Sequence, residues 1–259
     1  MIFQKNISLK KYTTFRIGGQ AKYFFIAKTK NDLLRAVKEA KERRLPFFIL
    51  GNGSNLLVSD EGYKGLVIKT GKPLSSYVSK GLEWAAGIPG TIEGAVYGNA
   101  GAFGQSMKDA VESAEVFDTK TKKVKIFKNK DCQFGYRTSI FKRNRDLIIL
   151  SVKIKRRKSD FKKIKEYLDY RKKTQPLNFP SAGSVFKNPS GFSAGELIEK
   201  CGLKGKKIGG AQISNVHANF IVNLGTATAQ DVLLLIKLIK KTVKKKFKIN
   251  LKEEIIFLT

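Results

Sequence analysis

The stretch Phe47-Phe48-Ile49-Leu50-Gly51-Asn52-Gly53-Ser54-Asn55-Leu56-Leu57-Val58 decides how the chain begins to fold. Its first four residues are apolar and predict a buried β-strand, which runs directly into a glycine-rich turn. Turns of this kind bring main-chain N–H groups to phosphate oxygens. Gly51 and Gly53 leave room for such an approach, and Ser54 and Asn55 add hydrogen-bond donors. The alternative is a tight turn with a structural role only.

A second glycine-rich turn, Gly87 to Gly94, could face the first across a groove, and two such turns suit a pyrophosphate. The spacing differs from the dinucleotide-binding G-x-G-x-x-G/A pattern, and no acidic residue follows at the distance that reads a ribose. It also differs from the P-loop, because no Gly-Lys-Ser or Gly-Lys-Thr occurs there. Spacing alone therefore leaves phosphate binding and two structural turns as alternatives.

Strand and helix patterns alternate outward from this stretch. Residues 31–44 carry apolar side chains at helical spacing and predict a helix with Asn31 as its N-cap. Strands are predicted at 23–27 and 65–69, so the chain has an α/β-like start. The remaining predicted elements are paired strands at 112–118 and 123–127, a strand at 147–155, helices at 161–173 and 194–201, strands at 211–214 and 219–223, an amphipathic helix at 228–247 and a closing strand at 255–258.

The composition predicts a soluble protein without a metal centre. Of 259 residues, 42% are hydrophobic, and no apolar run reaches the ~18 residues of a membrane helix. Met1 to Lys5 open no signal peptide, so we expect a protein of a reducing compartment, the cytoplasm. Two cysteines and one histidine exclude a disulfide framework, a four-cysteine zinc site and a multi-histidine metal centre.

The charge is strongly positive, because 51 lysines and arginines stand against 21 aspartates and glutamates, a net charge of +30. Such a balance favours polyanionic partners, although a lysine-rich solvated surface gives the same number. A nucleic-acid-binding module built on Lys155 to Lys158 and the lysine face of the last helix is therefore one hypothesis. No recognisable RNA- or DNA-binding motif supports it.

The composition shifts toward charged residues at 156–176, where we place a domain boundary. The predicted domains are residues 1–160, with a subdivision near residue 70, and residues 176–253. The last strand, 254–258, could pack back on the first domain. The glycine-rich region from Gly71 to Gly104 is predicted to be structured, since Trp84 and branched apolar residues are unlike a flexible linker.

Eight short motifs, each weak by itself, follow one another in a specific order. They are Thr14–Gly19, Gly51–Val58, Gly87–Gly101, Phe134–Ser139, Ala182–Pro189, Ile208–Gly210, His217–Phe220 and Leu251–Phe257. Together they resemble the UDP-N-acetylenolpyruvoylglucosamine reductases (UDP-N-acetylmuramate dehydrogenases) over nearly the whole chain. The chain looks like the short, type II form, because it lacks the insertion between Lys155 and Arg171 that carries a substrate-covering tyrosine in longer members.

The resemblance implies an α+β protein with a PCMH-type (vanillyl-alcohol-oxidase-like) FAD-binding domain at 1–160, followed by a smaller α+β substrate domain at 176–253. In this family NADPH reduces the flavin, which then passes hydride to the vinyl carbon of the enolpyruvyl ether of UDP-N-acetylglucosamine. The product is UDP-N-acetylmuramate, a precursor of peptidoglycan. The implied protein is a monomer that requires neither a membrane nor nucleic acid.

Three catalytic residues follow from matching the motifs position by position. The family's proton donor falls on Ser184, its active-site arginine on Arg137 and its catalytic glutamate on Glu254. These residue types suit the chemistry, because hydride transfer leaves negative charge that a guanidinium can stabilise and a held hydroxyl can protonate. The alternatives are a turn donor, a surface charge and a strand-end carboxylate.

The resemblance also implies binding residues. The implied cofactor-binding residues are Arg16, Gly18, Gly19, Gly51, Asn52, Gly53, Ser54, Asn55, Gly87, Ile88, Pro89, Gly90, Gly94, Asn99 and Gly101. The implied substrate-binding residues are Tyr136, Lys187, Asn188, His217 and Arg171. For His217 the alternative is a core or rim histidine, and for Arg171 it is the solvated face of a basic helix.

The chain departs from the family pattern in two places. The segment between Lys69 and Leu82 is shorter than usual and keeps only Gly71-Lys72-Pro73-Leu74 where the family has additional strands. Glu93 stands where many members have glycine. A shortened flavoprotein homologue without activity is therefore a further hypothesis.

Overall fold

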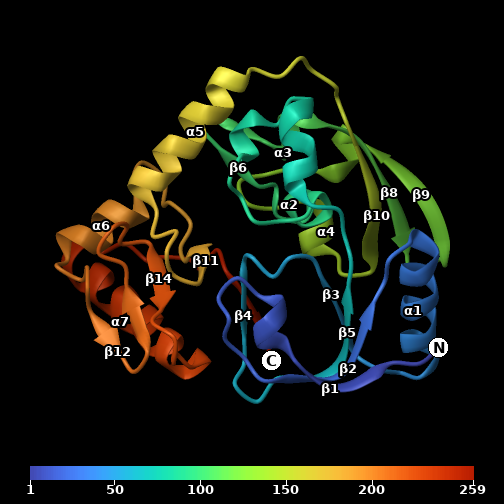
Figure 1. Cartoon of the computed structure of the whole chain (residues 1–259), viewed down its shortest axis with the longest axis horizontal. Coiled ribbons are helices and arrows are strands. Elements are labelled where there is room, and N and C mark those ends of the chain that lie inside the picture. The colour runs from blue at the N-terminus through green and yellow to red at the C-terminus, as the bar shows by residue number, and fades with distance from the viewer. The chain divides into compact units, whose positions relative to one another are not determined.

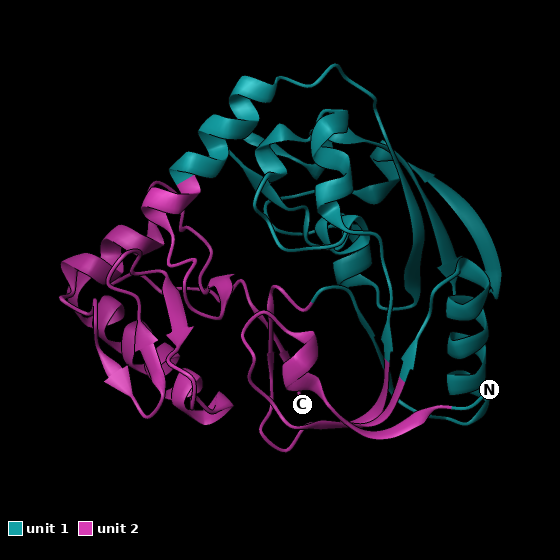
Figure 2. Cartoon of the chain, viewed as in Figure 1, with its two compact units in different colours: residues 1–2, 25–52, 68–170 teal, residues 3–24, 53–67, 171–259 magenta.

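The computed structural model describes residues 1–259, which divide into two compact units (Figures 1 and 2). Unit 1 consists of Met1–Ile2, Phe25–Asn52 and Ile68–Tyr170, and unit 2 consists of Phe3–Phe24, Gly53–Val67 and Arg171–Thr259. The units interleave along the chain, whereas the predicted domains at 1–160 and 176–253 are continuous. One unit boundary, after Tyr170, falls within the predicted boundary stretch, and the domain assignment stays a prediction.

The first part of the chain forms a four-stranded sheet and one helix. Strands β1 (Gln4–Ser8), β2 (Gln20–Ile26), β5 (Tyr63–Lys69) and β3 (Phe47–Leu50) are ordered β1-β2-β5-β3 in a four-stranded sheet. Strands β1 and β2 are antiparallel, with Gln4 opposite Phe24 and Ser8 opposite Gln20. The 3-10 turn η1 (Leu9–Tyr12) follows β1.

Helix α1 (Lys30–Glu42) begins one residue earlier than predicted, and its cap differs. Thr29, not Asn31, is the N-cap: the Thr29 hydroxyl accepts from the Asp32 N–H at 3.1 Å, and the Asp32 carboxylate accepts from the Thr29 N–H at 2.9 Å. This reciprocal pair satisfies two donors at once, which a cap at Asn31 would not do.

Unit 1 holds a three-stranded antiparallel sheet of order β10-β8-β9. The strands are β8 (Val111–Asp118), β9 (Lys123–Lys128) and β10 (Leu147–Ile154), as the sequence predicts. The smaller elements are η2 (Leu74–Lys80), η3 (Glu83–Ala85), α2 (Ile92–Gly98), β6 (Gly101–Ala102), β7 (Gln105–Ser106), α3 (Met107–Ala110), η4 (Asn129–Cys132) and α4 (Ile140–Arg143). Trp84 is only 1% exposed, so the glycine-rich region contributes to the core.

The shortened segment after β5 is fastened to the turn before α2. The Ile92 N–H donates to the Lys72 carbonyl at 2.9 Å, and the Leu74 N–H donates to the Gly90 carbonyl at 2.9 Å. Pro73 pairs with Thr91 in an isolated bridge between these bonds. Glu93 adds its carboxylate, which accepts from the Lys72 N–H at 3.0 Å, and burial raises the pKa of Glu93. Glu93 therefore helps to hold the segment between Lys69 and Leu82 in place.

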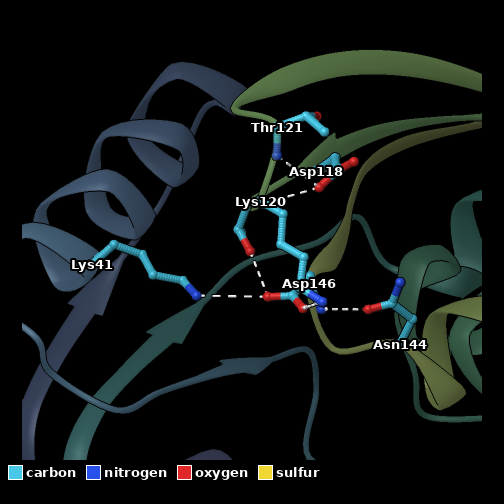
Figure 3. Close-up of polar contacts among 7 residues, drawn as sticks. Lys41, Asp118, Lys120, Thr121, Asn144 and Asp146 are labelled. Atoms are coloured by element: carbon cyan, nitrogen blue, oxygen red, sulfur yellow. Dashed lines mark hydrogen bonds and ion pairs between the residues drawn. The ribbon is translucent and has the colours of Figure 1, made fainter.

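The turn between β8 and β9 is held by two aspartates (Figure 3). Asp118 accepts hydrogen bonds from the Lys120 and Thr121 N–H groups and from Lys125 Nζ at 3.0 Å. Asp146 accepts from the Thr119 hydroxyl at 2.9 Å and pairs with Lys120 at 3.2 Å. The bond from Lys125 is the largest of the effects that lower the pKa of Asp118, and the bond from Thr119 is the largest that lowers the pKa of Asp146.

Acid should weaken this turn. Because both folded pKa values lie below the ordinary value, their stabilisation is complete above about pH 4 and is lost as the pH falls further. We expect Asp146→Asn to lower the free energy of unfolding by about 1 kcal/mol at pH 7, and by less at pH 3. Urea unfolding of both proteins between pH 3 and 7 measures the difference. A pH-independent difference would contradict this role for the Asp146 charge.

Unit 2 contains a four-stranded sheet of order β11-β14-β13-β12 (Figure 1). Its strands, β11 (Ser181–Ser184), β12 (Lys207–Ile208), β13 (Ala211–Ile213) and β14 (Phe220–Asn223), pair antiparallel. Helices α6 (Ala194–Lys200) and α7 (Ala229–Phe247) contribute to the same core. Val232, Ile236, Ile239 and Val243 of α7 are buried, which confirms the predicted amphipathic helix.

Two further elements complete the chain. Helix α5 (Phe161–Thr174) ends in unit 2, and β15 (Ile256–Leu258) pairs in parallel with β4 (Leu56–Val58). The pairing joins the last strand to the strand that follows the first glycine-rich turn, with Ile256 opposite Leu56. None of the helices is both long and apolar enough to cross a membrane.

Candidate active site

Ser184 and Glu254 lie on neighbouring main-chain segments of unit 2. Ser184 is the last residue of β11 and lies opposite Phe220 of β14. The chain then leaves β14 and pairs with the C-terminal segment: the Glu254 N–H donates to the Val185 carbonyl at 2.8 Å, and the Lys187 N–H donates to the Lys252 carbonyl at 2.9 Å. Two of the three predicted catalytic residues are thus brought together by hydrogen bonds that the sequence does not reveal.

Asn55 fastens the glycine-rich turn to Glu254. Its side-chain Nδ2 donates to the Glu254 carbonyl at 3.1 Å, and its own carbonyl accepts from the Ile256 N–H at 3.0 Å. The side-chain amide predicted to bind the cofactor is therefore engaged within the protein. Asn55 places the last predicted catalytic residue beside the turn.

The Thr14–Gly19 motif is attached to the same group of segments. The Thr14 hydroxyl donates to the Ser181 carbonyl at 2.7 Å, and the Thr14 N–H donates to the Gly53 carbonyl at 3.3 Å. The buried Asn223 side chain donates to the Phe15 carbonyl at 3.1 Å. Unit 2 therefore gathers the N-terminal motif, the part of the turn from Gly53 onward, the serine segment and the C-terminal segment.

Close packing explains why several positions that were predicted to bind the cofactor are occupied by glycine. A Cβ at Gly19 would lie 2.3 Å from the Asp60 carbonyl oxygen, and a Cβ at Gly53 would lie 2.3 Å from the Tyr12 carbonyl oxygen. Gly18 has φ +116° and approaches Val58 in the same way. A Cβ at Gly101 would lie 2.4 Å from the Gln105 carbonyl oxygen. These contacts give each glycine a structural reason that is independent of any ligand.

The two glycine-rich turns approach each other in unit 1. A Cβ at Gly51 would lie 2.7 Å from Thr91 Oγ1, and Thr91 is the N-cap of α2. The hydroxyl of Thr91 accepts from the Gly94 N–H at 3.2 Å. Gly87 has φ +79° and is exposed, as are Pro89 and Gly94. Gly51 and Thr91 are therefore in close contact, while a groove between the two turns stays a prediction.

The first turn keeps unpaired donors. The main-chain N–H groups of Asn52, Gly53, Ser54 and Asn55 donate to no other protein group. The hydroxyl of the neighbouring Thr13 is also buried without a hydrogen-bond partner. A buried polar group without a partner is costly, so the Thr13 hydroxyl fits a place beside the turn where a polar ligand binds.

Arg137 lies in unit 1, on a tight turn. Gly135 and Thr138 exchange main-chain hydrogen bonds of 3.0 and 3.2 Å, which leaves Tyr136 and Arg137 at the tip. Arg137 has φ +54°, an unfavourable value for a side chain of this size, and its guanidinium lies 5.5 Å from the centre of the Tyr136 ring. Asn99 Nδ2 donates to the Gly135 carbonyl at 2.8 Å and holds the turn to the end of α2. Backbone strain held by surrounding bonds is typical of functional sites.

The predicted substrate-binding residues occupy different environments. Tyr136 is 57% exposed, whereas Arg171 is 7% exposed, so the alternative of a solvated face for Arg171 is wrong. Burial lowers the pKa of Arg171. Asn188 is exposed, and its Oδ1 accepts from the Ala194 N–H at 3.0 Å, at the start of α6. The main chain of Lys187 is fixed by its bond to Lys252.

His217 supports a neighbouring asparagine that was not among the residues predicted for the site. The Asn219 N–H donates to His217 Nδ1 at 3.2 Å, and the Asn219 side chain is buried. Burial, followed by the nearby Lys204 charge, lowers the pKa of His217 and favours the neutral ring. With Nδ1 engaged, only Nε2 can reach a ligand. The signal for Asn219 was present in the His217–Phe220 motif, but no residue type there indicated its partner.

Comparisons with known proteins match most of this chain. The model of the UDP-N-acetylenolpyruvoylglucosamine reductase C-terminal domain matches residues 175–258, and an FAD binding domain model matches residues 21–80. The reductase of Caldanaerobacter subterraneus subsp. tengcongensis is 41% identical over 279 residues, covering 96% of this chain and 91% of the relative. The reductase of Alkaliphilus oremlandii is 42% identical, covering 95% and 90%.

A solved structure agrees. The crystal structure of UDP-N-acetylenolpyruvylglucosamine reductase from Thermus caldophilus is 35% identical, has a TM-score of 0.85 and is covered completely by this chain, as this chain is by it. The expected fold class is confirmed by this match and by the FAD binding domain. The alignment of 279 residues with the Caldanaerobacter reductase exceeds the 259 residues of this chain, so that relative has residues without a counterpart here. The chain belongs to the UDP-N-acetylenolpyruvoylglucosamine reductase family.

Proposed function

We propose that this chain is an FAD-dependent oxidoreductase that uses NADPH to reduce the enolpyruvyl ether of UDP-N-acetylglucosamine to UDP-N-acetylmuramate, a step of peptidoglycan precursor synthesis. Membership in the family and the FAD binding domain match support this function. The observation that carries it is the pairing of the Ser184 segment with Glu254 beside a turn of unpaired N–H groups. The reaction is proposed for a cytoplasmic monomer, with residues 1–160 as the FAD-binding domain and 176–253 as the substrate domain.

The glycine-rich turns fit a cofactor that carries a diphosphate. The unpaired N–H groups of Asn52 to Asn55 and the buried Thr13 hydroxyl are donors that phosphate oxygens would satisfy. We propose that they hold FAD together with the turn at Gly87 to Gly94 and the exposed Arg16. Bound FAD supplies the means to carry hydride from NADPH to the enolpyruvyl group.

Ser184 is proposed to donate the proton that completes the reduction. Once hydride has reached one vinyl carbon, the π electrons of the double bond move to the neighbouring carbon and its carboxylate. That carbon is a strong base, so a weakly acidic hydroxyl can protonate it when the hydroxyl is held in place. The Ser184 oxygen then recovers a proton from solvent. Glu254, on the adjacent segment, is proposed to orient the substrate or a water for this transfer.

Arg137 is proposed to stabilise the negative charge that develops. A guanidinium keeps its charge and can bind a carboxylate through two parallel hydrogen bonds. Its value in catalysis depends on being fixed before the charge appears. The strained turn, bonded to Asn99, provides that fixed position, and Tyr136 packs under the guanidinium. Lys187, Asn188, Arg171 and His217 are proposed to bind the nucleotide sugar.

The proposed activity can be tested directly on the purified protein. We expect the purified protein to carry flavin absorbance and to oxidise NADPH only when UDP-N-acetylenolpyruvoylglucosamine is present, with two hydrogens added to the substrate. Mass spectrometry of the product and the loss of NADPH absorbance measure this. A protein that cannot be reconstituted with FAD would favour the inactive-homologue hypothesis. Steep salt-dependent nucleic-acid binding in its place would favour the basic-module hypothesis.

A further inference from the structure

The ladder between β11 and β14 does not fix the main chain around Ser184 by itself. Ser181 lies opposite Val222 and Ser184 opposite Phe220, with a register shift between them. Gly183, within the shift, has φ +75°, and a Cβ added there would meet no atom within 4 Å. After Ser184 the chain turns away to pair with Lys252 to Glu254. Regular sheet bonds therefore end where the proposed acid is attached.

One side chain, that of Asn219, replaces the missing ladder. Asn219 Oδ1 accepts from the Phe186 N–H at 2.9 Å, and Asn219 Nδ2 donates to the Phe186 carbonyl at 2.8 Å. The Asn219 carbonyl accepts from the Val185 N–H at 2.8 Å. Asn219 thus makes three hydrogen bonds with the two residues that follow Ser184, and both polar atoms of its amide are used.

Asn219 is itself held firmly. Its side chain is 4% exposed, and its own N–H donates to His217 Nδ1. The His217 ring packs against Phe220, with ring centres 4.9 Å apart. The ring also lies close to Gly195, because a Cβ added there would be 3.1 Å from His217 Cε1. A buried amide whose oxygen and nitrogen are both hydrogen-bonded favours one orientation, so it can fix the position of its partner.

We propose that Asn219 is a positioning residue that fixes the Ser184 segment so that its hydroxyl is aligned to donate a proton to the substrate. The inference rests on the proposed function of Ser184. Asn219 acts through the main chain of Val185 and Phe186 and need not touch the substrate. Its amide is required as a pair of donor and acceptor, because Phe186 presents both an N–H and a carbonyl to it.

Separate measurement of the two half-reactions tests this role. In Asn219→Ala, NADPH should reduce the bound flavin within about 2-fold of the wild-type rate, while reoxidation by UDP-N-acetylenolpyruvoylglucosamine should slow by about 100-fold, the size expected for a misplaced catalytic group. The solvent deuterium isotope effect on reoxidation should rise, because proton transfer becomes the slow event. Combining Asn219→Ala with Ser184→Ala should slow reoxidation no further than Ser184→Ala does.

Two more variants separate positioning from general stability. Asn219→Asp keeps the acceptor for the Phe186 N–H but sets a carboxylate oxygen against the Phe186 carbonyl, so reoxidation should recover as lower pH protonates the aspartate. Ile239→Val removes one methyl from the same core, in α7, and should leave both half-reactions unchanged. Amide hydrogen exchange of the peptide 181–187, measured without substrate, should accelerate in Asn219→Ala and not in Ile239→Val.

The outcomes are distinguishable. If wild-type reduced flavin is not reoxidised by the substrate, the proposed function fails before Asn219 is at issue. If the wild type is reoxidised and Asn219→Ala matches its reoxidation rate, the positioning role is overturned. Equal slowing of both half-reactions, or additive losses with Ser184→Ala, would also overturn it.

Discussion

Ser184→Ala is expected to leave flavin reduction by NADPH nearly intact and to block turnover. The substitution removes only the hydroxyl of a residue whose main chain stays bonded through Val185 and Phe186, so the fold should persist. General acids typically contribute 10²–10⁴-fold, and we expect reoxidation by substrate to fall by roughly 1,000-fold. Anaerobic stopped-flow absorbance of the flavin measures each half-reaction separately.

An exposed serine nearby provides the matched control. Ser190→Ala also removes a serine hydroxyl, but from the exposed segment that follows Ser184. This variant should leave both half-reactions unchanged. Ser184→Cys should keep part of the reoxidation rate that Ser184→Ala loses, because a thiol is also a proton donor. Normal turnover in Ser184→Ala would remove Ser184 from the role of acid.

Arg137→Ala is expected to have the second-largest effect, again on the step that consumes the substrate. The loss of a fixed cation near developing negative charge typically costs about 100- to 1,000-fold. Arg137 also packs on Tyr136 and has a strained φ of +54°, so the substitution removes a ring contact together with the charge. Rates of flavin reoxidation at saturating and limiting substrate separate a loss of binding from a loss of catalysis.

Two variants define what the guanidinium contributes. Arg137→Lys keeps the charge but cannot form two parallel hydrogen bonds with a carboxylate, so most of the loss should remain. Arg145→Ala removes an exposed guanidinium from the same unit and should have little effect. Unchanged reoxidation kinetics in Arg137→Ala would exclude Arg137 from the site.

Periodic elements and ordered motifs were predictable from the sequence, because they depend on local patterns. Apolar residues at 47–50 and the spacing in α7 predicted a buried strand and an amphipathic helix. The helix and the strand are both confirmed, but in the strand only Leu50 is buried, and Phe47, Phe48 and Ile49 are half-buried. Elements without such patterns were missed. β1 is polar and largely exposed, and β11 consists of serine, alanine and glycine, so neither alternates between apolar and polar residues.

The sequence by itself determined the α/β-like start, the family motifs and which residue types could perform the chemistry. Only the tertiary structure decided that the Glu254 segment pairs with the residue after Ser184 and that the Asn55 side chain donates to the Glu254 carbonyl. It also decided that the Asn219 side chain binds the main chain of Phe186. It also decided that Arg171 is buried and not solvated. The physical reason is that helix and strand periodicity are set by neighbouring residues, whereas each of these hydrogen bonds has a main-chain partner distant in the sequence, and every sequence position carries such a group alike.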